Sequence, residues 1–244
     1  MNTKSHTNKN GLIRRVFYGR RRGHKLHPKQ GRLVESFLPS IRITDLAAAP
    51  KRAFAHNNFE PENLVMEIGF GGGEHLAAQA EANPNVGFIG CEPFLNGVAK
   101  LLNHIQQHDL LNIRIHDEDA RDLIELMPDS CLAAVYLLYP DPWPKKKHHK
   151  RRFVNPENLH HIHRLLQPDG IFYFASDIPD YVSWALVHIR DHGGFDWQAR
   201  ASADWQTPFA GWVRTRYEEK ALVAGRTPTY LRFQHREHIR PGYL

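Results

Sequence analysis

Apolar segments and amphipathic segments alternate along the chain from about residue 60 to residue 192. The apolar runs are rich in β-branched and aromatic residues, whereas the segments between them repeat apolar residues every three or four positions. The runs predict strands at 64–70, 86–92, 113–119, 131–139 and 171–177, and the intervening segments predict helices at 74–82, 94–108, 120–127, 156–167 and 180–192. Because the runs are apolar throughout, we expect a mostly parallel sheet with helices on both faces.

Two later segments, 195–199 and 227–233, predict edge strands, one of them antiparallel. The expected fold class is therefore α/β, with a doubly wound sheet of about seven strands. The stretch between these two segments is rich in Trp and Arg and has no clear pattern. We expect one domain over residues 33–244, preceded by a basic N-terminal arm at residues 1–32 that can be disordered.

Composition excludes several classes of protein. Apolar residues make up 41% of the 244 residues, which is enough for a large core. The longest unbroken apolar run, 131–139, is far shorter than the roughly 20 residues of a membrane-spanning helix, so we expect no membrane segment. Two cysteines cannot form a disulfide framework and no apolar leader is visible, so we expect a cytoplasmic protein.

Positive charge is concentrated in two acid-free segments, although the net charge is only +6. Residues 1–32 hold ten Lys and Arg, and residues 145–152 hold six more, so the rest of the chain carries −10. This asymmetry favours a polyanionic partner over a merely solvated face. An organelle transit peptide is a weaker interpretation of the first segment, because serine is nearly absent and Gly and Pro interrupt any amphipathic helix.

Acidic residues follow each of the first four predicted strands. In a parallel sheet the carboxyl ends of strands form one rim, where ligands bind. The first strand contains Glu67 and runs into the glycines Gly69, Gly71 and Gly73, which allow close approach of a ligand. The following strands end at Glu92, Asp119 and Asp141.

The pattern favours S-adenosylmethionine over a dinucleotide. A dinucleotide loop needs a third glycine where this chain has Glu74, and a carboxylate there repels phosphate. S-adenosylmethionine has no phosphate and carries positive charge on its sulfonium and amino groups. We expect Glu92 to bind the ribose hydroxyls and Asp119 the adenine amine.

The segment YPDPWPKKKHHKRRF, residues 139–153, follows the fourth strand. Three prolines stiffen the loop and fix the directions of Asp141 and Trp143, and six cations follow immediately. A rigid acidic and aromatic loop beside a phosphate-binding run is what methylation of a base in folded RNA requires. We therefore favour a role at the site for Trp143 over one in the core.

Several motifs together resemble the bacterial tRNA (guanine-N7-)-methyltransferase family over roughly residues 30–234. They are EIGFGGGEHL, Glu92, PDPWPKKKHHKRR, SDIPDY and RTRYEEKAL. The resemblance implies a class I, Rossmann-like methyltransferase domain that transfers a methyl group from S-adenosylmethionine to N7 of guanosine 46 in the tRNA variable loop. It implies neither a membrane nor an obligate partner subunit, and it is compatible with a monomer or a homodimer.

The resemblance also implies the site residues. It places Glu67, Gly69, Gly71, Gly73, Glu92, Asp119 and Asp141 at the cofactor, with Asp141 also catalytic. Substrate positions are Lys145, Asp177, Thr215, Arg216, Tyr217 and Glu218, and the RNA-contacting run is Lys147, His148, His149, Lys150, Arg151 and Arg152. The family's usual Thr-Lys-Phe-Glu block reads Thr-Arg-Tyr-Glu here, and the basic arm at 18–25 is longer than a minimal member needs.

The chemistry needs no general base, because guanine N7 carries a lone pair and no proton. Positioning should supply most of the rate, and carboxylates would stabilise the cationic product ring. Asp177 and Glu218 are candidate acceptors for the N1–H and N2 amine of guanine. Asp177 could instead cap the helix that follows it.

Seventeen histidines raise the possibility of a metal site, with clusters at 148–149 and 160–163. Neither HExxH nor paired CxxC spacing occurs, so we expect no bound metal and place these imidazoles on the surface or facing RNA.

Three alternative functions remain. A methyltransferase for another RNA or for a protein would not need this basic loop. A non-catalytic RNA-binding module would not need the acids. A dehydrogenase is disfavoured by Glu74.

Overall fold

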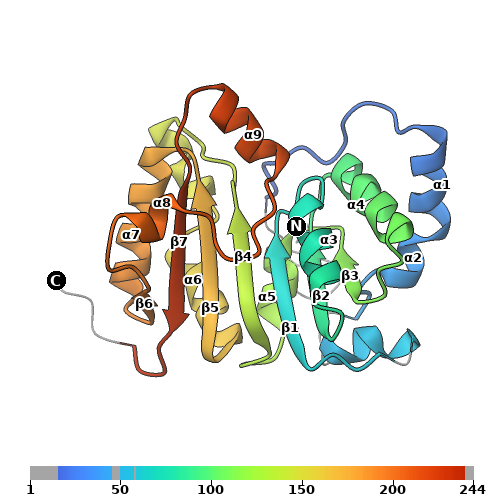
Figure 1. Ribbon diagram of the computed structural model, residues 1–244, viewed down its shortest axis with the longest axis horizontal. Coiled ribbons are helices and arrows are strands. Elements are labelled where there is room, and N and C mark those ends of the chain that lie inside the picture. The colour runs from blue at the N-terminus through green and yellow to red at the C-terminus, as the bar shows by residue number, and fades with distance from the viewer. Residues whose placement is uncertain (1–15, 46–49, 58, 240–244) are drawn as a thin grey trace, which may run out of the picture.

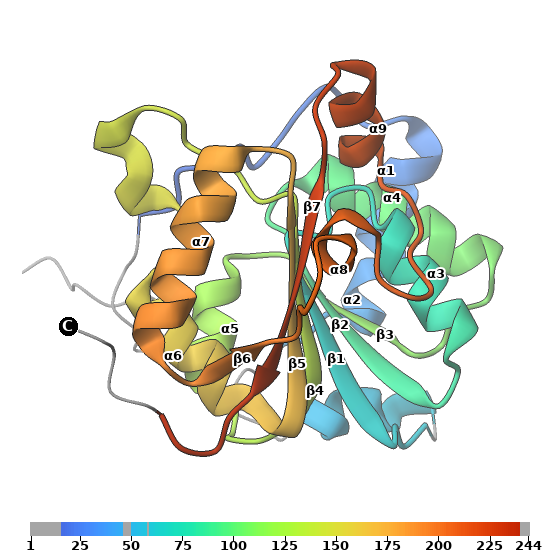
Figure 2. The ribbon, with the colours of Figure 1, turned by 60° about the vertical axis from the view of Figure 1, so that its left-hand side comes forward.

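The computed structural model describes residues 16–45, 50–57 and 59–239. Within them a central sheet is flanked by helices on both faces, as Figures 1 and 2 show. The elements, in chain order, are α1 (Pro28–Ser36), α2 (Leu38–Ile41), η1 (Pro50–Asn57), β1 (Asn63–Ile68), α3 (Glu74–Ala82), β2 (Val86–Cys91), α4 (Leu95–Gln107), β3 (Ile113–His116), α5 (Ala120–Leu126), β4 (Leu132–Leu138), η2 (Lys146–Arg151), α6 (Pro156–Leu165), β5 (Leu166–Ser176), α7 (Pro179–His192), β6 (Phe195–Trp197), α8 (Ala203–Gln206), α9 (Arg216–Val223) and β7 (Thr229–His235).

The sheet confirms the predicted fold class. Its seven strands run in the order β3-β2-β1-β4-β5-β7-β6. The first five pair in parallel, and β7 pairs antiparallel with both β5 and β6. The reversed β7 points downward in Figure 1 while β4 points upward. The carboxyl ends of β1 to β5 therefore meet at one rim, as the sequence predicts.

Two apolar cores lie on opposite faces of the sheet. On one face α5, α6 and α7 pack through Ile124, Leu159 and Tyr181, and on the other α1 to α4 pack through residues such as Leu76 and Leu101. Figure 2 shows these two helical layers on either side of the sheet. Burial of these side chains at about 25 cal/mol per Å² is the main force that holds the layers together.

The stretch without a sequence pattern covers the face of the sheet beside β4, β5 and β7. Phe209 and Trp212 pack against a small core that contains Tyr230 of β7, and Tyr136 of β4 stacks on Tyr173 of β5 at 4.4 Å between ring centroids. Phe209 and Trp212 thus cover that face in place of a long helix. This arrangement also brings α9 to the rim of the sheet (Figure 1).

Several element boundaries differ from prediction. β5 begins at Leu166 rather than 171, and between the pairs Leu132–Leu166 and Ala134–Ile171 four residues of β5 lie opposite one residue of β4. β3 ends at His116, because Asp119 leaves the strand to cap α5. The domain boundary expected after residue 32 falls inside α1, and residues 1–15 of the expected arm lie outside the described part of the chain.

Candidate active site

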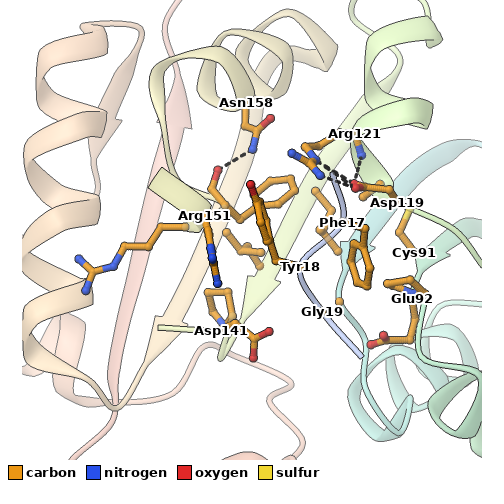
Figure 3. A pocket seen from close by; sticks show the side chains of 18 of the residues that line it. Phe17, Tyr18, Gly19, Cys91, Glu92, Asp119, Arg121, Asp141, Arg151 and Asn158 are labelled. Atoms are coloured by element: carbon orange, nitrogen blue, oxygen red, sulfur yellow. Dashed lines mark hydrogen bonds and ion pairs between the residues drawn. The ribbon is translucent and has the colours of Figure 1, made fainter. Parts of the chain in front are cut away.

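A pocket of about 440 Å³ opens at the rim, where the carboxyl ends of β1, β2 and β4 meet. This volume lies within the range of small-ligand sites. Glu92, Asp119 and Asp141 all line it, together with Gly69. Figure 3 shows the carboxylates of Glu92 and Asp141 on the same side of the pocket. The structure therefore brings together three of the four predicted acids.

The glycine loop borders this pocket in a conformation that glycine favours. Gly69, Gly71 and Gly73 have φ angles of 74°, 59° and 80°, in the left-handed region. A Cβ on Gly69 would meet no atom within 4 Å, so the backbone there borders open space. Gly71 and Gly73 do not line the pocket, and Gly73 is the N-cap of α3.

Glu92 is held at the end of β2 by backbone donors. Its Oε2 accepts a hydrogen bond from the Gly71 N–H at 2.8 Å, and its Oε1 accepts one from the Phe94 N–H at 2.9 Å. Burial raises the pKa of this carboxyl, these two hydrogen bonds lower it, and the nearby charge of Asp141 raises it again; the net shift is upward. Each oxygen keeps a further lone pair that can accept from a ligand hydroxyl.

Asp119 is the N-cap of α5. Its Oδ1 accepts from the Arg121 N–H at 3.0 Å, and the Arg121 guanidinium contacts both carboxylate oxygens. Arg121 also lines the pocket, although the sequence interpretation gave it no role. The sequence could have indicated this role, because Arg121 stands two residues after Asp119, a predicted pocket acid.

Glu67 lies outside the pocket lining. Its Oε2 is 2.8 Å from Nδ1 of His75, and both side chains are almost fully buried. The residues of a strand alternate between its two faces, and Ile68, the next residue, is the one that reaches the pocket. The structure therefore places Glu67 in a buried pair beside the glycine loop.

The loop after β4 carries Asp141 to the pocket. Tyr139 and Trp143, on either side of it, have φ angles of 50° and 44°, which residues other than glycine rarely adopt. Desolvation by the surrounding loop raises the pKa of the Asp141 carboxyl above its usual range. Trp143 also lines the pocket, and its role at the site stays a prediction.

The basic run forms a short 3₁₀ turn, η2, next to this loop. Lys150 and Arg151 line the pocket, while Lys145 and Lys147 are exposed outside it. The Arg151 guanidinium lies 4.2 Å from the ring centroid of Tyr18 and 4.9 Å from that of Trp143. Cations of the run thus stand directly beside Asp141.

Three other members of the run lie differently. The His148 ring meets Trp143 edge-on at 5.9 Å, and the half-buried His149 ring meets Trp184 at 5.4 Å. Arg152 has a side chain with no exposed surface, paired with Asp180. Arg152 also lines the pocket, so the contact with RNA predicted for it stays a prediction, although protein encloses its side chain here.

The described part of the N-terminal arm crosses the pocket. Phe17, Tyr18, Gly19 and Arg20 line it, and Figure 3 shows Tyr18 and Phe17 projecting into it. The arm is tied to the start of α4: the Leu95 N–H donates to Arg21 O at 3.0 Å, and the Asn96 side chain bonds the backbone of 23–24. The sequence interpretation missed these contacts, because nothing local connects the arm to residues more than 70 positions away.

The block 215–218 caps α9 and reaches the pocket only through Tyr217. Thr215 Oγ1 accepts from the Glu218 N–H at 3.2 Å, as an N-cap residue does. The Tyr217 ring lies over the glycine loop, since a Cβ on Gly71 would be 2.8 Å from its Cε2. Arg216 lies outside the lining, with its guanidinium 4.9 Å from the Tyr217 ring centroid.

Neither candidate guanine reader lines the pocket. Glu218 is buried, and its two oxygens accept from Trp212 Nε1 at 2.6 Å and from the Tyr230 hydroxyl at 2.7 Å. Asp177 pairs with Arg226. The N-cap of α7 is Ile178, so the alternative in which Asp177 caps this helix is wrong.

Gly97 is a further residue that supports the glycine loop. A Cβ at this position, in the first turn of α4, would lie 2.1 Å from the carbonyl oxygen of Gly71. Glycine is unfavourable inside a helix by about 1 kcal/mol relative to alanine, so close packing explains its presence. The signal in the sequence was a glycine inside the predicted helix 94–108.

Histidines are not gathered around a metal position. Among the described residues, no group of three or more His, Cys, Asp and Glu side chains is arranged to hold a metal ion. His163, which we expected on the surface or facing RNA, is half-buried: its Nε2 is 2.9 Å from Arg236 O, and its ring packs against His192 and His235. In the part of the chain that the structure describes, every helix is too short or too polar to cross a membrane.

Solved structures share this architecture. A structure described as an antibiotic-related methyltransferase superposes with a TM-score of 0.55 at 14% identity, over 81% of this chain and 98% of its own. The 16S rRNA methyltransferase KamB superposes with a TM-score of 0.56 at 16% identity, over 77% and 94%. At these identities the likeness concerns the fold alone, and the fold is that of the class I, Rossmann-like methyltransferases.

Sequence comparison defines the family. The methyltransferase family model Methyltransf_4 matches residues 61–231. A tRNA (guanine-N(7)-)-methyltransferase of Agrobacterium fabrum is 49% identical over 89% of this chain and 94% of its own, and one of Rhizobium johnstonii is 50% identical over 92% and 96%. This chain belongs to the tRNA (guanine-N(7)-)-methyltransferase family.

Proposed function

We propose that this protein transfers the methyl group of S-adenosylmethionine to N7 of guanosine 46 in the variable loop of tRNA. The observation that carries the proposal is one juxtaposition. The pocket is lined by Glu92, Asp119 and Asp141, and Lys150 and Arg151 of the basic run line the same pocket. Carboxylates suit a cationic methyl donor, and adjacent cations suit an RNA backbone.

The residues present fit S-adenosylmethionine. The open space beside Gly69 accepts a ligand close to the backbone, and the free lone pairs of Glu92 can accept from two ribose hydroxyls. Asp119, which lines the pocket between Glu92 and α5, can accept from an adenine amine. When bound, S-adenosylmethionine supplies a methyl group on a positively charged sulfur.

The chain's own groups then orient the base and stabilise charge. The N7 lone pair of guanine forms the new bond to the methyl carbon as the carbon–sulfur bond breaks, so no proton has to move. Asp141 stands where the base must enter, and its negative charge stabilises the purine as it becomes cationic. Trp143 and Arg151 offer flat surfaces for stacking at the same entrance.

A nucleoside assay tests the proposal. The purified chain is incubated with labelled S-adenosylmethionine and an unmodified tRNA transcript, and the digested nucleosides are identified by mass and retention. We expect 7-methylguanosine from the full transcript and none from a transcript with adenosine at position 46. Methylation of both transcripts would overturn the position, and a different methylated nucleoside would overturn the substrate while keeping the cofactor.

A binding measurement separates the alternatives. S-adenosylmethionine, but not NAD, should raise the Tm, because a ligand stabilises only the folded state that binds it. A rise with NAD would instead support a dehydrogenase.

A further inference from the structure

The loop that carries Asp141 has little support of its own. Pro140, Pro142 and Pro144 have no N–H, so only Asp141 and Trp143 could donate from the backbone of this loop. Among the described residues, the backbone of 140–144 makes a single hydrogen bond, in which Arg152 Nε donates to Pro142 O at 2.8 Å. The carbonyl that it holds belongs to the residue directly after Asp141.

Arg152 is itself fixed from three sides. Its Nη2 donates to Asp180 Oδ2, and its guanidinium lies 5.0 Å from the ring centroid of Tyr181 and 5.1 Å from that of Trp184. The three partners stand in the first two turns of α7, and the hydrogen bond from Arg152 lowers the pKa of Asp180. Asp180 is therefore ionised at neutral pH and holds the buried cation.

Arg151 and Arg152, which are neighbours in the basic run, thus have different contacts. Both residues line the pocket, but Arg151 stacks on Tyr18 and Trp143, whereas the fully buried Arg152 side chain packs against α7 and binds the loop through Pro142 O. A planar guanidinium can bind a carbonyl and a carboxylate at once while stacking between two rings, which a lysine cannot do. Arg152 therefore has the geometry of a support rather than of an RNA contact.

We propose that Asp180 and Arg152 are positioning residues, which act through the Pro142 carbonyl to hold Asp141 in place for methyl transfer. The proposal rests on the proposed function only for its kinetic consequence. It also gives the motif SDIPDY a role: α7 delivers Asp180 to the back of the catalytic loop. Arg152 touches neither base nor phosphate in this arrangement.

Arg152→Lys tests the proposal, because it keeps the charge and removes the planar fork. We expect kcat to fall about tenfold, because a catalytic group that is slightly misplaced stabilises the transition state less well. The Kd for S-adenosylmethionine, the KM for tRNA and the salt dependence of tRNA binding should stay within about threefold of the original values. Arg164→Lys is the matched control, since Arg164 also binds backbone carbonyls and an aspartate, Asp129, but lies outside the pocket lining.

A second readout does not depend on activity. The NMR order parameters of the Asp141 and Trp143 amides should fall in Arg152→Lys and stay unchanged in Arg164→Lys. If the wild-type protein made no 7-methylguanosine, the proposed function would fail while the order parameters still tested the support of the loop.

Asp180 allows a rescue experiment even if Arg152→Lys does not fold, because its side chain is 66% exposed. Asp180→Asn should reproduce the loss of kcat and the lower order parameters, and Asp180→Glu should restore most of both. Unchanged kcat and order parameters in Asp180→Asn, or a loss of tRNA affinity and salt dependence in place of kcat, would overturn the proposal.

Discussion

Glu92 and Asp119 are held at the pocket by donors that follow the first strands, whereas the loop of Asp141 is held by a side chain anchored on α7. Glu92 accepts from Gly71 and Phe94, and Asp119 accepts from Arg121. In the Asp141 loop, three prolines lack an N–H, and the Arg152 side chain binds the loop from another part of the chain. One side of the pocket is built by backbone geometry close to each acid, and the other depends on tertiary packing.

The largest effect should come from Asp141. Asp141→Ala should lower kcat about 100- to 1000-fold, the usual cost of removing one group that stabilises transition-state charge. The Tm should change little, because the side chain stands at the open rim. Single-turnover methylation and thermal unfolding measure the two quantities, with Asp129→Asn, outside the pocket lining, as the control. Normal turnover in a folded Asp141→Ala protein would remove Asp141 from the mechanism.

Glu92→Gln should mainly affect the cofactor. An amide group would turn an N–H₂ toward the N–H of Gly71 or Phe94 and would leave a donor unpaired. We expect the Kd for S-adenosylmethionine to rise about 10- to 100-fold, since an unsatisfied buried group costs about 1–3 kcal/mol. Calorimetric titration measures it, and Glu74→Gln, outside the pocket lining, is the control. Equal losses in the two variants would contradict a specific role for Glu92.

Gly97→Ala should disturb the glycine loop from behind. The new Cβ would lie too close to the Gly71 carbonyl oxygen, so the glycine loop must shift. We expect cofactor binding to weaken about tenfold and the free energy of unfolding to fall by about 1–3 kcal/mol. Gly31→Ala is the matched control, because a Cβ there meets nothing within 4 Å. It should stabilise α1 by about 1 kcal/mol. Denaturant unfolding compares the two.

The raised pKa values of Glu92 and Asp141 should make activity and stability depend on pH in opposite directions. Burial raises the pKa of Glu92 and desolvation that of Asp141, so protonation removes ligand acceptors, and kcat/KM should fall as the pH drops through the raised values. The stability of the ligand-free protein behaves inversely. A raised carboxyl pKa contributes stability below its ordinary value, and this contribution is lost as the pH rises through the raised one. Comparing Tm against pH with Glu92→Gln isolates the effect; parallel curves would speak against it.

The smallest effect should come from the exposed lysines. Lys147→Ala combined with Lys150→Ala should weaken tRNA binding severalfold and reduce the slope of log K against log salt by about 1.5, because each phosphate contact releases condensed counterions. The kcat at saturating tRNA should be unchanged. Lys51→Ala combined with Arg190→Ala removes the same charge elsewhere. The same slope in both double variants would mean that η2 is only a solvated surface.

Much of the first side of the pocket could be predicted because its causes are local. Apolar runs fixed five parallel strands, and an acid at the end of a strand must lie at the rim. Glu67 shows the limit of this rule. Side chains alternate between the two faces of a strand, and at the end of β1 Ile68 lines the pocket while Glu67 does not. Similarly, the position of the basic run beside Asp141 followed from adjacency, but which of its cations face outward did not.

By itself the sequence determined the doubly wound sheet, the acids Glu92, Asp119 and Asp141 at one rim, and a basic run beside them. The reason is that strand period, helix period and turn residues act over a few positions. Only the tertiary structure decided that Arg152 pairs with Asp180 and that Tyr18 lines the pocket. It also decided that Glu218 accepts hydrogen bonds from Trp212 and Tyr230. These outcomes depend on which distant side chains pack together, and no local pattern encodes that choice.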